Sequence, residues 1–324
     1  MFFKDKNILV TGGCGFVGGH LVEELVKLKA NVIVIDEYND PLSYFSSQKL
    51  HQKVRLIKHD ICNFDKIFEI LTKHNIEYIF HLAAQPIVDI AYHNPHRTLE
   101  VNIMGTVNVL ESARRFHKIK GIVFASSDKA YGKLTGYKSV PIRYKETDAL
   151  RGDHPYEVSK SSADLIATAY YKTYGVPVVI TRFGNIYGEG DLNFSRIIPG
   201  ILKAIVNKKE LLIRSNGQYV RDYLYVKDVV KGYLTVAENI DKVKGEAFNF
   251  GSLDTLSVIE LILLVSKKLK RKINYRILNQ AKNEIPYQAL DFSKVEKLLN
   301  WKPKLKLRSV IAHIYKWYDK MFVK

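Results

Sequence analysis

The sequence predicts an α/β fold in which a doubly wound parallel sheet is followed by a smaller mixed α/β domain. Two observations support this class. Through the first 180 residues, short β-branched segments alternate with longer segments of helical periodicity. The strand-like segments are apolar at nearly every position, which is typical of a parallel sheet covered by helices on both faces. After about Arg182 the alternation ends, and shorter, mixed elements follow.

Each expected strand of the first part is a short apolar run, and the segment after it has the periodicity of a helix. The expected strands are Asn7–Thr11, Asn31–Asp36, Val54–Lys58, Tyr78–Leu82, Gly121–Ser126 and Val178–Arg182. The expected helices between them are Phe16–Leu28, Phe64–Lys73, Thr98–Phe116 and Pro155–Tyr174. Later helices are expected at Ile197–Val206, Asp228–Glu238, Ser257–Leu269, Ser293–Leu299 and Val310–Met321. The stretch Lys133–Gly152 has neither pattern, and a loop of this length predicts a lid or an insertion.

The composition is that of an ordinary globular protein. Of the 324 residues, 47% are hydrophobic and 26% are charged, which excludes a disordered chain, collagen and a coiled coil. The 50 Lys and Arg residues against 33 Asp and Glu give a net charge of +17. This charge indicates either a polyanionic partner (nucleic acid, an anionic membrane or a phosphorylated substrate) or simply a lysine-rich surface.

Other features narrow the class of protein. Cys14 and Cys62 cannot form a disulfide framework, and no His, Cys or carboxylate cluster has the spacing of a metal site. The longest strongly apolar stretch, Leu256–Val265, is about half of the ~20 residues that a membrane span needs. The N-terminus lacks the apolar region of a signal peptide. We therefore expect a reduced, cytoplasmic protein without a metal and without a membrane partner.

A glycine-rich turn connects the first strand to the first helix. It contains Gly12, Gly15 and Gly18, with Phe16 and Val17 between the last two. Such a turn lets backbone N–H groups approach a pyrophosphate at the N-terminus of the helix. Asp36 ends the second strand about 20 residues further on, where a carboxylate can bind the adenosine ribose hydroxyls and repel a 2′-phosphate. The turn predicts a Rossmann-type domain that binds NAD rather than NADP.

The GxxGxxG spacing resembles the short-chain dehydrogenase/reductase superfamily. Asp60 and Ile61 follow the third strand, where the resemblance implies contact with adenine. Leu82, Ala83 and Ala84 lie at the end of the fourth strand, where the family's backbone passes the cofactor ribose, and Asn102 lies in the long helix as in extended members. We expect residues 1–182 to form the NAD-binding domain, joined by a segment near 225–250. Residues 183–324 are expected to be mainly the nucleotide-sugar-binding domain.

The chemistry is expected at Tyr156, Lys160 and Ser127. Tyr156 and Lys160 are four residues apart on one helix, so the lysine ammonium can lie beside the phenol and lower its pKa, which favours a general base. Tyr223 and Lys227 have the same spacing, but Tyr223 lies in an alternating, strand-like segment. Ser127 follows the fifth strand, whose carboxyl end faces the ligand crevice of an open α/β sheet.

The residues after Ser127 make the resemblance more specific. The chain resembles extended family members that act on nucleotide sugars, and Asp128-Lys129 is similar to the CDP-glucose 4,6-dehydratase branch. This implies oxidation at C4, loss of water across C5 and C6, and return of the hydride to C6. Asp128 is the expected acid at O6. Lys129 is the candidate base at C5, with the alternatives that it only orients the sugar or is one more surface lysine. The alternative is a 4-epimerase of the UDP-hexose type, and a more remote one is a non-catalytic NAD- or RNA-binding protein.

The resemblance also implies substrate contacts and a homodimer. The expected substrate-binding residues are Gln85, Ser127, Asn185, Arg196, Arg221 and Asn249. Arg221 resembles the family's diphosphate clamp, for which a planar guanidinium suits bidentate binding. Two copies are expected to pair through a four-helix bundle formed by the helices at Thr98–Phe116 and Pro155–Tyr174. The motifs thus indicate NAD and a nucleotide-diphosphate sugar, rather than nucleic acid, as the anionic partners.

Overall fold

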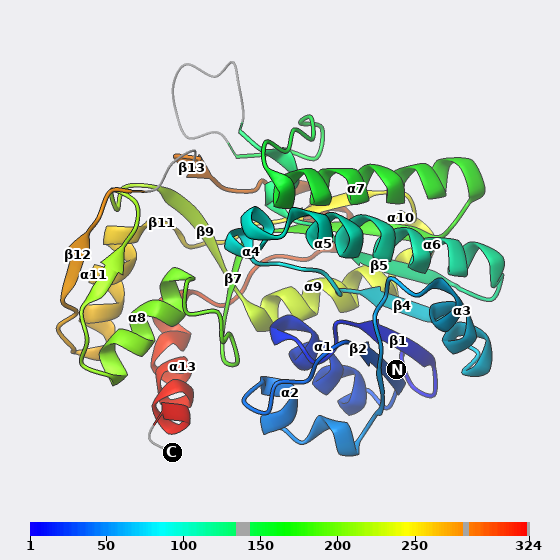
Figure 1. Ribbon diagram of the computed structural model, residues 1–324, viewed down its shortest axis with the longest axis horizontal. Helices are drawn as coiled ribbons and strands as arrows, with labels where there is room; N and C mark the ends of the chain where they lie inside the picture. The colour runs from blue at the N-terminus through cyan, green and yellow to red at the C-terminus, as the bar shows by residue number, and fades with distance from the viewer. Residues whose placement is uncertain (134–142, 281–284, 323–324) are drawn as a thin grey trace.

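The computed structural model describes residues 1–133, 143–280 and 285–322. Its centre is a seven-stranded parallel sheet with the strand order β10-β6-β5-β4-β1-β2-β3, which confirms the predicted Rossmann-type α/β class (Figure 1). The strands are β1 Asn7–Thr11, β2 Asn31–Asp36, β3 Arg55–Lys58, β4 Tyr78–His81, β5 Gly121–Ala125, β6 Val178–Phe183 and β10 Ala247–Phe250. The predicted bounds of the first six differ from these by at most one residue at each end.

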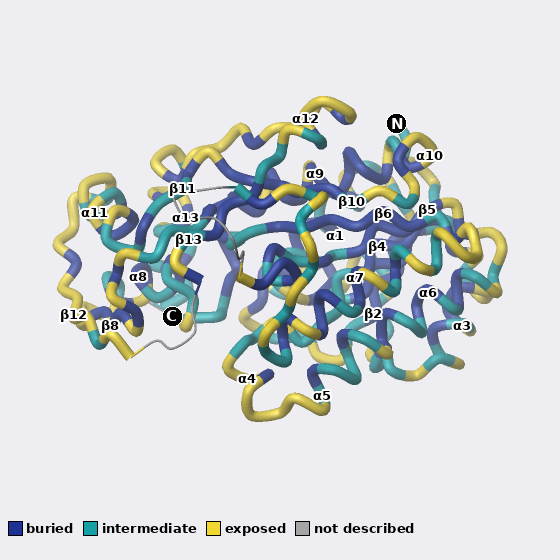
Figure 2. The backbone as a smooth tube through the Cα atoms, turned by 90° about the horizontal axis from the view of Figure 1, so that it is seen from above, coloured by how far each residue is buried: buried dark blue, intermediate teal, exposed yellow. Residues whose placement is uncertain are grey.

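Helices cover both faces of this sheet. Helices α3 (Phe64–Lys73), α6 (Gly105–Arg115) and α7 (Pro155–Tyr174) pack on one face, and α1 (Phe16–Lys27) and α9 (Val226–Glu238) pack on the other. The two hydrophobic clusters between these helices and the sheet explain why its strands are apolar on both sides. Figure 2 shows the buried strands in the middle of this larger lobe.

The predicted helix Thr98–Phe116 differs from the structure. The chain forms α5 (Pro95–Leu99), a π-helical turn at Glu100–Met104 and then α6. The helical segment begins earlier because Pro95 occupies the first turn, where its missing N–H costs nothing, and the Asn94 side chain accepts a hydrogen bond from the Arg97 N–H at 3.2 Å. Gly105 lies against the Ile61 side chain, and a Cβ on Gly105 would overlap it.

The smaller lobe is built from short strands and helices around its own hydrophobic cluster (Figures 1 and 2). Its strands are β7 Asn185–Tyr187, β8 Leu211–Ile213, β9 Val220–Tyr225, β11 Thr255–Ser257, β12 Tyr275–Ile277 and β13 Tyr287–Gln288. Its main helices are α8 Ile197–Val206, α11 Val258–Leu269 and α13 Leu307–Phe322. The remaining helices of the described residues are α2 Tyr44–Ser47, α4 Val88–His93, α10 Ile240–Val243 and α12 Ser293–Leu299, with 3-10 turns at Leu50–Gln52 and Asp128–Tyr131.

The second half of the expected loop Lys133–Gly152 joins the two lobes. Residues 134–142 of that loop lie outside the described residues, but Tyr144 forms an isolated bridge with Leu290, and Arg143 donates to the Leu290 carbonyl at 2.9 Å. Within the described ranges, no helix is both long and apolar enough to cross a membrane.

Candidate active site

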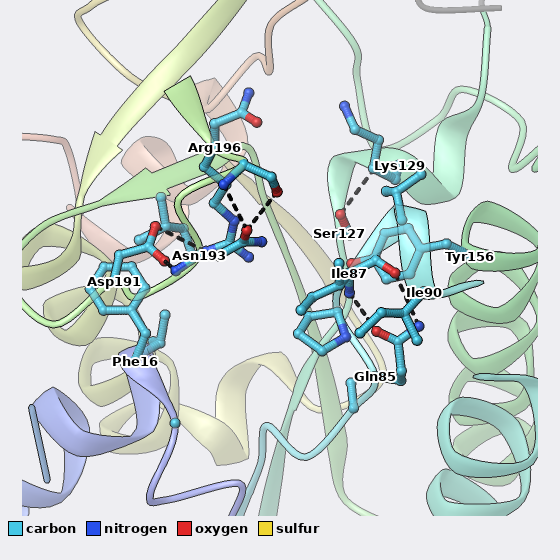
Figure 3. Close-up of a pocket in the computed structure, with 18 of the residues that line it drawn as sticks. Phe16, Gln85, Ile87, Ile90, Ser127, Lys129, Tyr156, Asp191, Asn193 and Arg196 are labelled. Carbon is cyan, nitrogen blue, oxygen red and sulfur yellow. Dashed lines mark hydrogen bonds and ion pairs between the residues drawn. The ribbon is translucent and has the colours of Figure 1, made fainter. Parts of the chain in front are cut away.

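A cleft of about 1410 Å³ lies between the two lobes, at the carboxyl ends of the central strands. Ligands bind at this edge of open α/β sheets. A typical small-molecule site measures roughly 300–1,000 Å³, so this cleft is large enough for two ligands together. Figure 3 shows Ser127, Lys129 and Tyr156 on one wall, with Asp191, Asn193 and Arg196 on the facing wall.

The glycine turn closes one end of the cleft, and its glycines are required by the backbone packing. Gly12 has φ +72°, and a Cβ there would lie 2.7 Å from the Ala83 backbone nitrogen. A Cβ on Gly18 would overlap the Gly12 carbonyl. Gly15 is the N-cap of the 12-residue helix α1 and brings no capping side chain. The helix therefore presents an open, positively polarised N-terminus that can bind a pyrophosphate.

Two carboxylates line the same end of the cleft. Asp36 accepts a hydrogen bond from the Cys14 N–H at 2.8 Å, which holds the glycine turn against the second strand. Burial raises the pKa of Asp36, although the N–H groups of Cys14 and Tyr38 oppose the shift. Asp60 is paired with Arg97 at 2.6 Å; burial alone would raise the pKa of Asp60, but the Cys62 N–H and Arg97 lower it overall. An ionised carboxylate at Asp36 suits ribose hydroxyls and disfavours a 2′-phosphate.

Nearly all the residues expected to bind the cofactor line this cleft, as does Gln85. These are Gly12, Gly15, Phe16, Val17, Gly18, Asp36, Asp60, Ile61, Leu82, Ala83, Ala84, Tyr156 and Lys160. Asn102 is the exception, because it is buried behind the wall. Its amide accepts from the Gln85 N–H at 2.7 Å and donates to the Ser159 hydroxyl at 2.8 Å, so it supports the wall rather than facing the ligand space.

Ser127, Asp128 and Lys129 form a tight cluster where β5 ends. The Ser127 hydroxyl donates to the Asp128 carboxylate and accepts from the Lys129 N–H, both at 3.1 Å, as the 3-10 turn begins. Lys129 Nζ lies 3.7 Å from Asp128 Oδ2, and both side chains are largely buried. A hydrogen bond joins Ser127 to Tyr156 at the start of α7. The structure thus brings the predicted catalytic residues together on one wall.

The pKa of Tyr156 is raised overall in the structure, and the lowering effect of Lys160 on this phenol stays a prediction. Burial raises the pKa of Tyr156 to about 12, and the groups that oppose this shift are Arg196 and the Ser127 hydroxyl. The Lys160 ammonium donates to the Ala125 carbonyl at 3.0 Å, and burial lowers its own pKa to about 8. The sequence predicts the helical spacing of the pair but cannot predict how far the pair is removed from water.

The other expected substrate residues divide into two groups. Asn185, Arg196 and Arg221 line the cleft from the smaller lobe, and Arg196 is held by the buried Asp191 at 3.2 Å. Asn249 does not line it. Its side chain is fully buried, accepts from the Tyr131 hydroxyl at 2.7 Å and donates to the Tyr144 carbonyl at 2.9 Å, so it braces the loop behind the catalytic turn. Tyr223 lies on β9, as its alternating sequence predicts.

Three features of the site have no clear signal in the sequence. His154 lines the cleft and is the N-cap residue of α7, but its side chain makes no capping hydrogen bond. Its Nε2 lies 3.3 Å from Glu157, and its buried Nδ1 has no hydrogen-bond partner among the described residues. Asp164 and Arg182 form a buried ion pair beneath the catalytic turn. Gln288 reaches the same turn from the smaller lobe.

The comparisons with known proteins agree with this geometry. The family model described as GDP-mannose 4,6 dehydratase matches residues 9–314. The chain belongs to this family. Among its curated relatives, CDP-glucose 4,6-dehydratase of Salmonella typhimurium is 31% identical to this chain, over 98% of this chain and 91% of the relative. CDP-paratose 2-epimerase of Salmonella typhi is 28% identical, over 96% and 98%.

Solved structures divide in the same way between two reactions. The dTDP-glucose 4,6-dehydratase DesIV from Streptomyces venezuelae, with NAD and TYD bound, has a TM-score of 0.87 at 26% identity, over 97% of both chains. The UDP-glucuronic acid 4-epimerase from Bacillus cereus, with UDP-glucuronic acid and NAD, has a TM-score of 0.88 at 26% identity, over 97% and 99%. The family's relatives are therefore nucleotide-sugar dehydratases and epimerases, and overall similarity does not distinguish the two reactions.

Proposed function

We propose that this protein is an NAD-dependent nucleotide-sugar 4,6-dehydratase, with CDP-glucose or GDP-mannose as the best candidate substrates. One observation carries the proposal: Asp128 and Lys129 adjoin Ser127 and Tyr156 in the same cleft wall. A 4-epimerase needs Ser127, Tyr156 and Lys160 but has no proton to move at C5 or O6. An acid and a base beside the oxidation site are what an elimination requires.

The cofactor end of the cleft fits NAD. Backbone N–H groups at the start of α1 would hold the pyrophosphate, and Asp36 would accept hydrogen bonds from the ribose hydroxyls. Solved relatives that contain NAD support this choice. When bound, NAD supplies a hydride acceptor for C4 and a hydride donor for C6, and is unchanged over the full cycle.

The side chains of this protein move the protons. Tyr156 takes the proton of the C4 hydroxyl while Ser127 holds that oxygen by a hydrogen bond, and Arg196 and Ser127 favour the phenolate because both lower its pKa. The C4 ketone makes the C5 proton acidic. Lys129, when neutral, removes the C5 proton, and Asp128 protonates O6, so that O6 leaves as water. The product is a nucleotide-diphospho-4-keto-6-deoxyhexose.

The Asp128–Lys129 pair suits this elimination because the transfer of one proton converts its ion-pair state into its neutral state. The ion pair becomes a neutral pair when one proton moves from Nζ to the carboxylate 3.7 Å away. The neutral pair holds both the base and the acid that the step uses. After the elimination Lys129 is protonated and Asp128 is ionised. As the hydride returns to C6, Lys129 gives its proton back to C5, and the proton that Tyr156 took from O4 passes to Asp128, which restores the starting state of all three groups.

A panel of nucleotide sugars, scored by mass spectrometry, tests the proposal. We expect loss of one water from one member of the panel, whereas a mass-neutral product would identify an epimerase. Asp128→Asn and Lys129→Met should each slow the dehydration by roughly 10²–10⁴-fold. Lys172→Met, at an exposed lysine on α7, is the matched control and should leave the rate unchanged.

The proposal includes a homodimer paired through α6 and α7. The outer face of α7 exposes Val158 at 39% and Leu165 at 58%, which is apolar surface that a second copy could cover. Light scattering on the purified protein tests this part separately. A monomer at micromolar concentration would contradict it.

A further inference from the structure

Gln288 links the smaller lobe to the catalytic turn. It ends β13, is fully buried, and lies 159 positions away from Lys129 in the sequence. Its Nε2 donates to the Asp128 carbonyl at 3.1 Å, and its Oε1 accepts a hydrogen bond from Lys129 Nζ. Both ends of one buried amide are thus bonded to the two residues assigned to the elimination.

We propose that Gln288 is a positioning residue that holds the Lys129 amine at Asp128 and, as a neutral acceptor, leaves that amine able to lose its proton. This inference rests on the proposed function. A lysine side chain has many rotamers, so a base on such a flexible stem needs a fixed partner to stay in one geometry. The two-point contact of Gln288 with the turn supplies that partner.

The lack of charge on the Gln288 amide decides its electrostatic effect on Lys129. Asp128 on its own turn and Glu157 on α7 are titratable groups that the structure places near Lys129, and Glu157 is itself paired with His154. A carboxylate at position 288 would add a second negative charge in contact with Nζ and would favour the ammonium form. An amide gives the same hydrogen bond without that charge.

The strand pairing connects this contact to substrate binding. Gln288 is in register with Arg221 on the parallel strand β9, and the Arg221 side chain lines the facing part of the cleft. A shift of the smaller lobe would therefore move Arg221 and the acceptor of Lys129 as one unit. This arrangement suits a site in which the base is aligned only when both lobes are in place.

The test compares Gln288→Glu with wild type and with Gln52→Glu, a matched change at an exposed glutamine. The first readout does not depend on turnover: Lys129 is acetylated across a pH series, and its labelling is followed by peptide mass spectrometry. Gln288→Glu should move the midpoint of labelling upward by about one pH unit or more. An unchanged midpoint would overturn the inference, whatever reaction the enzyme catalyses.

The second readout is the kcat–pH profile for dehydration. Gln288→Glu should lower kcat at neutral pH by about tenfold or more at unchanged KM, and activity should recover as the pH rises. Gln288→Ala, which adds no charge, should also lower kcat at unchanged KM. If Gln288→Ala raised KM and kept kcat, Gln288 would only support the substrate lobe, and the inference would be wrong. Wild-type enzyme that removes no water from any sugar tested would instead refute the proposed function.

Discussion

The buried ion pair beneath the catalytic turn gives the most quantitative test of the structure. Asp164, one turn after Lys160 on α7, accepts from Arg182 Nε and Nη2, both at 2.8 Å, and from the Ser126 hydroxyl at 2.7 Å. Arg182 also donates to the Tyr131 hydroxyl at 2.7 Å. The side chains of Asp164 and Arg182 are 1% and 5% exposed. Asp164→Ala would leave a buried guanidinium without its counter-charge.

The expected loss of stability follows from that burial. Removing one partner of a buried ion pair costs about 3–5 kcal/mol, because the remaining charge is desolvated and unpaired. Glu24→Ala is the control, since Glu24 pairs with Lys27 at 2.8 Å but is 42% exposed. An exposed pair of this kind contributes about 0–1 kcal/mol.

Thermal unfolding monitored by fluorescence measures the difference. At roughly 2–4 °C per kcal/mol, Asp164→Ala should lower Tm by at least about 6 °C, and Glu24→Ala by less than about 4 °C. Asp164 also raises the pKa of Lys160 against the effect of burial, so the variant should lower that pKa further. A Tm for Asp164→Ala equal to that of Glu24→Ala would refute the reasoning that burial makes this pair important.

Three further predictions concern the cofactor end and the catalytic lysine. Asp36→Ala should weaken NAD binding and narrow the preference for NAD over NADP, as measured by calorimetry with both cofactors; an unchanged preference would contradict its role. Gly18→Ala places a methyl group against the Gly12 carbonyl, and it should lower the free energy of unfolding by about 1–3 kcal/mol and weaken NAD binding. Unchanged NAD binding by this variant would contradict the close packing of Gly18 against Gly12. Because burial lowers the pKa of Lys160 from 10.5 to about 8, the unfolded chain binds more protons between these two values, and wild-type stability should rise with pH across that window. Lys160→Met has no amine to titrate, so its free energy of unfolding should fall relative to that of wild type by about 3 kcal/mol between pH 7 and pH 10.5, as measured by urea titration. If the free energies of unfolding of the two proteins changed with pH in parallel, the Lys160 ammonium would be hydrated and the prediction would be wrong.

The sequence predicted the larger lobe well because its signals are local. The bounds of Asn7–Thr11, Phe64–Lys73 and Pro155–Tyr174 agree with the structure, since an apolar run or an amphipathic period is visible within one segment. The strands of the smaller lobe that were not predicted are mostly two or three residues long, as in β13. Strands this short depend on pairing with distant segments, which leaves little pattern in their own residues.

The sequence by itself determined the Rossmann-type fold, the glycine turn with Asp36, and the Ser127, Tyr156 and Lys160 pattern. Each of these follows from residue types and spacings that are visible along the chain, namely alternating strand and helix patterns, a glycine turn followed by a second strand, and a strand end followed by a helix. Only the tertiary structure decided that Tyr156 has a raised pKa, that Asn102 and Asn249 lie behind the cleft wall, and that Gln288 contacts Lys129. Burial, and contacts such as Asn102–Ser159, Asn249–Tyr144 and Gln288–Lys129, which join residues 57, 105 and 159 positions apart, arise only when distant segments pack. Desolvation then outweighs what neighbouring residues along the chain would predict.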